Sequence, residues 1–278
     1  MVTTRSQNKN SEPNPGEKRS HTKAATVQAR EPETKHQKTE SSTKTKSGAK
    51  DEGDKGSEQY TNGESLSNPK IRQLISQYGE LPLSQTDLSD PDKPTPDTIL
   101  ALLLNAMLSS TRISHSLAAK TVDLVIKAGY HKLDVLKKST WEERTEVLTK
   151  GGYTHYREKT ATMMGDLAQL IEDKYGGDLN TILQLTSEDP AKIRAELKTI
   201  KGLGDVGINI FFDTVQHLWT CLAPFVDPRS LKTAKEIGIG DDVHALWKEV
   251  SENPEQMCRL ASALTKLRLE GKQKEFKD

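Results

Sequence analysis

A glycine corner between two apolar helical segments is the feature that most constrains how this 278-residue chain can fold. Leu197 and Ile200 lie at helical spacing, and Gly202-Leu203-Gly204 then interrupts the helix. Glycine adopts positive φ without strain, so these residues predict a tight turn. Apolar residues resume a 3.6-residue period over 208–215, which predicts a second helix directly after it. Two helices joined so closely expose backbone N–H groups at the start of the second, where a phosphate oxygen is favoured.

A single aspartate follows the second apolar segment. In the run Pro224-Phe225-Val226-Asp227-Pro228, the aspartate precedes a proline, a pattern typical of a helix N-cap with proline at the first helical position. An aspartate in this place accepts backbone N–H bonds and stays ionised. The same carboxylate can stabilise a positive charge that develops in a reaction, or orient water. Taken by itself the pattern favours a cap, and the two roles can coexist.

Together, the corner and the aspartate resemble the helix-hairpin-helix and Gly/Pro-Asp pattern of the HhH-GPD DNA glycosylases, the endonuclease III superfamily. The matching residues are Gly202, Leu203, Gly204, Pro224, Val226 and Asp227. The resemblance runs over about 98–239. It implies base-excision repair by cleavage of the N-glycosidic bond of a damaged base, with Asp227 as the catalytic group that stabilises the oxocarbenium-like sugar.

The chain lacks three groups that other members of that family use in catalysis or cofactor binding. The nucleophilic lysine of the members with lyase activity corresponds to Val206, and the glutamate of the adenine-mismatch members corresponds to about Asn105. Cys221 and Cys258 do not have iron–sulfur spacing. The resemblance therefore implies a monofunctional glycosylase without lyase activity, metal or other cofactor. Its logic is closest to the alkylation-repair members, because a cationic alkylated purine leaves without an acid.

The resemblance also implies a surface that contacts DNA. The residues assigned to it are Lys201, Gly202, Leu203, Gly204, Val206, Gly207, Thr111, Arg112 and Arg229. Thr111 corresponds to the residue that fills the gap left by an extruded base, although a solvent-facing helix end explains it equally well. Asp205 is unfavourable beside a phosphate and can instead cap the second helix.

Three further residues are candidates to line a base pocket. Tyr153, His155 and Tyr156 follow a glycine pair, and aromatic side chains stack on nucleobases. Residues of this kind more often pack beside a loop, so both interpretations stay open.

The fold class follows from periodicity, because no segment shows sustained period-two alternation and an all-α domain is therefore predicted. The segment 98–108 is apolar on nearly every face and is predicted to be a central, buried helix. The resemblance implies two helical lobes within 66–278, with Asp227 facing a cleft between them on the same side as the hairpin. These lobes are about 66–112 plus 228–278, and about 113–227, which includes the hairpin at 197–217.

The composition indicates which parts of the chain are ordered and in which cellular compartment it is expected. Residues 1–65 are charged, polar and poor in large apolar side chains, which predicts a disordered tail. Lys18-Arg19 is a candidate nuclear-import signal, so a nuclear location is expected, although a solvated linker is the simpler role for any one residue there. Two cysteines suit a reducing compartment, and no apolar run reaches transmembrane length. The expected partner is double-stranded DNA containing a damaged base, bound by a monomer, with no membrane involved.

Two other functions also fit the sequence. A catalytically inactive helix-hairpin-helix protein that binds DNA or assists repair is favoured by Val206, Asn105 and Asp205. A helical interaction module unrelated to DNA fits the formal net charge of zero, because nucleic-acid binding usually rests on a basic surface. That third function leaves the pairing of the glycine corner with the aspartate unexplained.

Overall fold

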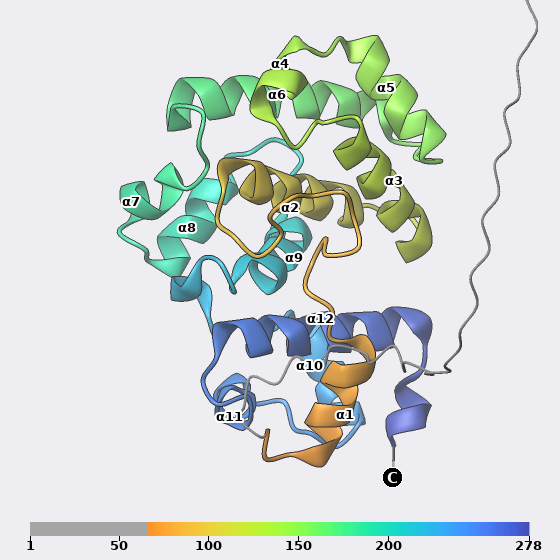
Figure 1. Cartoon of the computed structure of the whole chain (residues 1–278), viewed down its shortest axis with the longest axis vertical. Coiled ribbons are helices and arrows are strands. Elements are labelled where there is room, and N and C mark those ends of the chain that lie inside the picture. The colour runs from red at the N-terminus through yellow and green to blue at the C-terminus, as the bar shows by residue number, and fades with distance from the viewer. Residues whose placement is uncertain (1–65, 278) are drawn as a thin grey trace, which may run out of the picture. The chain divides into compact units, whose positions relative to one another are not determined.

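The computed structural model describes residues 66–277, and the predicted tail over 1–65, with Lys18-Arg19, lies outside the described residues (Figure 1). The described part is all-helical, which confirms the predicted fold class. Within it, no helix combines the length and the apolar character needed to cross a bilayer. The elements are α1 (Pro69–Tyr78), α2 (Pro96–Ser109), α3 (His115–Lys127), α4 (Leu133–Lys138), α5 (Trp141–Lys150), α6 (Arg157–Tyr175), α7 (Thr181–Thr186), α8 (Pro190–Leu197), α9 (Asp205–Val215), η1 (Thr220–Leu222), α10 (Pro228–Glu236), α11 (Val243–Glu249), α12 (Pro254–Glu270) and η2 (Gln273–Phe276).

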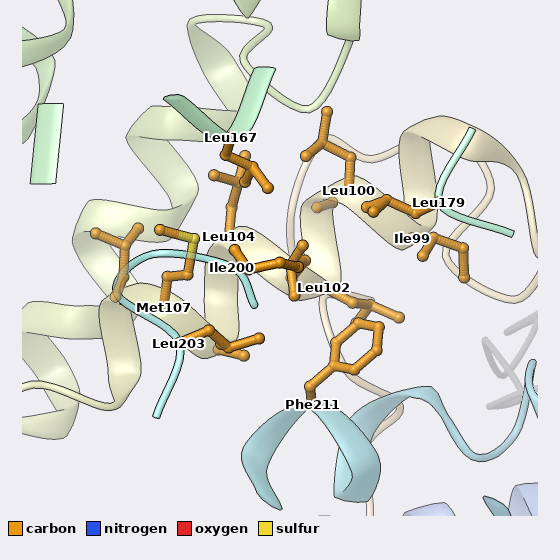
Figure 2. Close-up of a cluster of buried hydrophobic side chains, with 14 of the residues drawn as sticks. Ile99, Leu100, Leu102, Leu104, Met107, Leu167, Leu179, Ile200, Leu203 and Phe211 are labelled. Atoms are coloured by element: carbon orange, nitrogen blue, oxygen red, sulfur yellow. The ribbon is translucent and has the colours of Figure 1, made fainter. Parts of the chain in front are cut away.

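Helix α2 is the centre of the larger of two hydrophobic cores. Every residue over 98–108 except Asn105 is buried, which confirms the predicted central helix. Helices α3 and α9 pack along it, and Figure 2 shows Leu167 of α6 and Phe211 of α9 turned toward its leucines. A helix that is apolar on all sides is stable in water only when neighbours surround it.

Helix α12 organises the second core. Helices α1 and α10 pack on α12, and α11 contributes Leu246 to the same cluster (Figure 1). The predicted lobe boundary at residue 112 is wrong, because α2 belongs to the first core and α1 to the second. The chain therefore changes lobe in the connection between α1 and α2, and it returns near Val226, which is buried in the second core.

The glycine corner joins α8 to α9 as the sequence predicted. Gly202 has φ +87°, and a Cβ at this position would collide with the sulfur of Met163. The side chain of Leu203 is buried and points toward α2 (Figure 2). A Cβ on Gly207 would lie 2.8 Å from Leu203 Cδ1 and 3.5 Å from Ser110 Cβ, so the first turn of α9 approaches the end of α2 closely. The corner is thus anchored in the core while its backbone remains at the surface.

Candidate catalytic site and nucleic-acid interface

Asp227 is the N-cap of α10, with Pro228 at the first helical position. Its Oδ1 accepts hydrogen bonds from the backbone N–H of Arg229 at 2.8 Å and from Arg229 Nε at 2.9 Å, and its Oδ2 accepts one from Arg229 Nη2 at 3.1 Å. Only 2% of the Asp227 side chain is exposed, against 45% for Arg229. The predicted cap is confirmed, and the carboxylate is also paired with a guanidinium through both oxygens.

Helix α9 fixes the backbone that leads to Asp227. The buried Gln216 side chain donates to the Phe225 carbonyl and accepts from the Phe225 N–H, both at 3.0 Å. One turn earlier, Asp213 Oδ1 accepts the backbone N–H of Asp227 at 2.8 Å. Asp213 lies eight residues, or about 12 Å of helix rise, beyond Asp205 at the start of α9. The second hairpin helix therefore follows the glycine corner at one end and holds Asp227 near the other.

The two carboxyl groups of this site have opposite pKa shifts. Burial, followed by the charge of Asp227, raises the pKa of Asp213 well above its ordinary value. Burial also raises the pKa of Asp227, but hydrogen bonds from the side chain and backbone of Arg229 outweigh it, so the pKa of Asp227 is lowered. The pair therefore combines Asp213, which keeps its proton to higher pH than an ordinary aspartate, with Asp227, which ionises more readily. This arrangement separates an acid from a charge-stabilising group.

A cavity of about 350 Å³ lies between the two hydrophobic cores, next to this pair. The connection after α1 and helices α2, α3, α9, α10 and α12 all contribute to its wall. Its polar lining includes Asn105, Ser109, Asp213, Arg229, Thr265 and Arg268. A larger depression of about 540 Å³ beside α2, α4 and α6 contains none of the predicted site residues.

The structure modifies the prediction that Asp227 faces this cleft. Asp213 and Arg229, which both bond to Asp227, are among the described residues of the cavity wall, whereas Asp227 is not. The physical reason is the Arg229 guanidinium, which covers the carboxylate and gives it an ion pair in exchange for water. Helix α9 does reach the cavity, because Ile210 lines it about one turn after Gly207, which packs against Ser110.

The residues assigned to DNA contact separate into surface and core groups. Lys201, Val206 and Arg112 are exposed, and Lys201 Nζ pairs with Asp166 at 3.0 Å. Leu203 is buried, so only its backbone remains a candidate for contact with DNA. Thr111 is half-buried because its hydroxyl donates to the Leu108 carbonyl at 3.0 Å.

Asp205 does not cap α9, contrary to the sequence interpretation. Gly204 is the N-cap, and among the described residues no side chain caps the first turn. The Asp205 carboxylate is 68% exposed and pairs with Lys198 Nζ at 2.8 Å on the preceding helical segment. The backbone N–H groups of the corner therefore stay available to an anion, with one negative charge close by.

The structure does not bring the predicted base-pocket residues Tyr153, His155 and Tyr156 to the cavity beside Asp213. Tyr153 is buried in the first core and its hydroxyl donates to Thr111 Oγ1 at 3.0 Å. The rings of His155 and Tyr156 meet edge to face with centroids 4.6 Å apart. The described lining of the interlobe cavity includes none of the three, so these aromatic residues brace the loop before α6.

No family model matches the chain. No curated protein matches it either. Among solved structures it is similar to the crystal structure of H. pylori 3-methyladenine DNA glycosylase (MagIII) bound to 1,N6-ethenoadenine. That similarity has a TM-score of 0.46 and 16% sequence identity, and it covers 72% of this chain and 96% of the other.

Sequence reasoning missed Asp213 and Gln216, the two residues that hold Asp227 in place. A signal for Asp213 was present, because it interrupts the apolar run Phe211-Phe212-Asp213-Thr214-Val215 on the predicted second hairpin helix. A charged side chain in such a place is retained only when a specific partner or function compensates for its burial. Gln216 has no comparable signal in the sequence.

Proposed function

We propose that this protein is a monofunctional DNA glycosylase of the HhH-GPD type, acting on a damaged base in double-stranded DNA. The observation that carries the proposal is the ionised Asp227 beside a cavity between two helical cores, fixed by the same helix that begins at the glycine corner. The corner offers backbone N–H groups to a phosphate, and the cavity offers a space for an extruded base. A carboxylate next to that space stabilises the positive charge that develops on the sugar.

Catalysis by Asp227 requires Arg229 to release at least one carboxylate oxygen. The Arg229 side chain is 45% exposed and lies on the cavity wall, so it is positioned to exchange its partner. A DNA phosphate offers the guanidinium an equally favourable bidentate anion. In this proposal, DNA binding draws Arg229 toward the backbone and frees the carboxylate for the sugar.

The decisive test is release of free base from duplexes that each carry one damaged base. Purified full-length protein in excess is incubated with cationic (3-methyladenine, 7-methylguanine) and neutral (hypoxanthine, uracil, 8-oxoguanine) lesions, and the released base is measured by chromatography. We expect release from at least one duplex without strand nicking, because Val206 supplies no nucleophilic amine. Release from none of them contradicts the proposed activity.

One observation favours the alternative of an inactive DNA-binding protein. In the structure both oxygens of Asp227 are occupied by Arg229. If that pair persists on DNA, the protein binds damaged duplexes without releasing a base. Salt-dependent binding together with absent release identifies this alternative, whereas absent binding at low salt excludes both DNA functions.

The charge of Asp205 yields a prediction about DNA affinity. Asp205→Asn removes an exposed carboxylate beside the corner and frees Lys198 to approach a phosphate. We expect affinity for an undamaged duplex at 50 mM salt to rise by about 3-fold, since water and salt screen the repulsion between one exposed charge and a phosphate. Fluorescence anisotropy checks this, with Asp134→Asn in the first turn of α4 as the matched control. An unchanged or weaker affinity for Asp205→Asn alone would place the DNA elsewhere.

A further inference from the structure

Asp213 lines the cavity between the two cores, and the proposed chemistry has so far given its carboxyl group no role. We propose that Asp213 donates a proton to the leaving base, and that the substrate is therefore a neutral damaged base that cannot leave unprotonated. This inference rests on the proposed glycosylase function. It replaces the sequence-based expectation of a cationic alkylated purine, which arose because Asn105 supplies no acid.

The geometry places Asp213 where a proton donor is needed. Asp213 is one of the residues that line the cavity, and it is only 6% exposed. Oδ1 accepts the backbone N–H of Asp227 at 2.8 Å, which fixes the acid beside the charge-stabilising carboxylate. A neutral carboxyl group keeps one O–H to donate while it accepts that bond. The acid thus lines the cavity, and the Asp227 carboxylate lies next to it behind Arg229.

The rest of the wall is suited to a neutral base held edge-on. Ile113, Val122 and Ile210 provide apolar surface, while Asn105, Ser109 and Thr265 provide hydrogen-bonding groups. Arg268 also lines the cavity, and its Nε is buried with no hydrogen-bond partner among the described residues, so a ligand reaches it only if the side chain turns toward the cavity. A buried donor of this kind is costly unless a ligand acceptor satisfies it. A carbonyl or ring nitrogen of an extruded base is such an acceptor.

Asp213 is surrounded by groups that act in opposite directions on its protonation. Burial and the charge of Asp227 hold its pKa well above the ordinary value, against the lowering effect of Arg229 and Arg268. The titratable and charged groups around it and along the cavity are Asp227 and Arg229 at α10, Cys258, Lys266 and Arg268 on α12, His115 on α3, and Glu80 in the connection after α1. The net result is a carboxyl group that is protonated below its raised pKa and loses its proton above it.

The reaction balances with water as the only co-reactant. The bond between the sugar carbon and the base nitrogen breaks, and its electron pair goes to the base as Asp213 transfers its proton to a base nitrogen. Asp227 stabilises the sugar cation, and a water molecule attacks that carbon. The proton lost by the water returns to the Asp213 carboxylate, so the acid is regenerated. The products are a neutral free base and an abasic sugar.

The test compares Asp213→Asn with wild type on the neutral and cationic duplexes named above, under single-turnover conditions with full-length protein. Asparagine keeps an oxygen that can accept the Asp227 N–H but has no carboxylic proton. We expect release of the neutral base to fall by about 10²-fold or more, and by at least tenfold more than release of a cationic base. Wild-type release of the neutral base should also fall as the pH rises through the pKa of Asp213. The rate of release of a cationic base should not show this decrease at alkaline pH.

The outcomes separate this inference from the function beneath it. A wild-type protein that releases only cationic bases overturns the role of Asp213 but leaves the glycosylase intact. If Asp213→Asn slows release of neutral and cationic bases equally, Asp213 only positions other groups. The same conclusion follows if wild-type release of the neutral base does not fall at alkaline pH. The pH profile of wild type decides the matter even if Asp213→Asn does not fold. Release from no duplex removes the glycosylase proposal itself, and this inference with it.

Discussion

Replacing Asp227 with asparagine should lower the single-turnover rate of base release by about 10³-fold, because the reaction loses its negative charge next to the developing sugar cation. Asparagine caps helices as well as aspartate does, and its oxygen can still accept the Arg229 N–H at the start of α10. The fold is therefore expected to persist while the chemistry is lost. Chromatography of released base measures the rate, and thermal melting verifies folding.

Asp242→Asn is the matched control for this experiment. Asp242 caps α11 by accepting from the backbone N–H groups of His244 and Ala245, and its side chain is exposed away from the cavity lining. The same atoms change in both variants, but only one lies beside Asp213 and Arg229. A wild-type rate in Asp227→Asn would exclude Asp227 as the essential group, and an equal loss in Asp242→Asn would point to a general effect of helix capping.

The second large effect concerns the helix that carries the site. Phe211→Ala should reduce the free energy of unfolding by about 3–5 kcal/mol, the usual cost of deleting a fully buried phenylalanine. Phe211 is 0% exposed and meets the Trp219 ring edge to face, with centroids 5.4 Å apart. Figure 2 shows its ring turned toward α2. Urea denaturation followed by circular dichroism measures the change.

Leu185→Ala serves as its control, because Leu185 is 59% exposed and burial is what the prediction depends on. We expect a change within about 0.5 kcal/mol there, as for most surface substitutions. A loss below about 1 kcal/mol for Phe211→Ala would mean that α9 is not anchored through this ring. Since α9 carries Asp213 and ends at its C-cap Gln216, a folded Phe211→Ala protein should release base more slowly as well.

Local patterns were sufficient for the elements of this fold. The period of the apolar residues predicts α2 and α9, and Gly202 predicts the corner because its φ of +87° favours glycine. Asp227 before a proline predicts the cap of α10 for the same local reason, since a capping bond joins residues two positions apart. Each of these features depends on contacts within a few residues, so the sequence displays them directly.

The arrangement of the site depends on contacts that no local pattern displays. Asp213 meets Asp227 across 14 positions of sequence, and Gln216 meets Phe225 across 9. The lobe boundary falls before α2 because the apolar surface of α2 has to be covered on all sides. Helices α3 and α9 of the first core pack along it. The sequence by itself determined an all-helical chain with a glycine corner and a capping aspartate. Only the tertiary structure decided that the carboxyl group of Asp213 is buried beside Asp227. Burial and the neighbouring negative charge act on Asp213 only once the helices have packed.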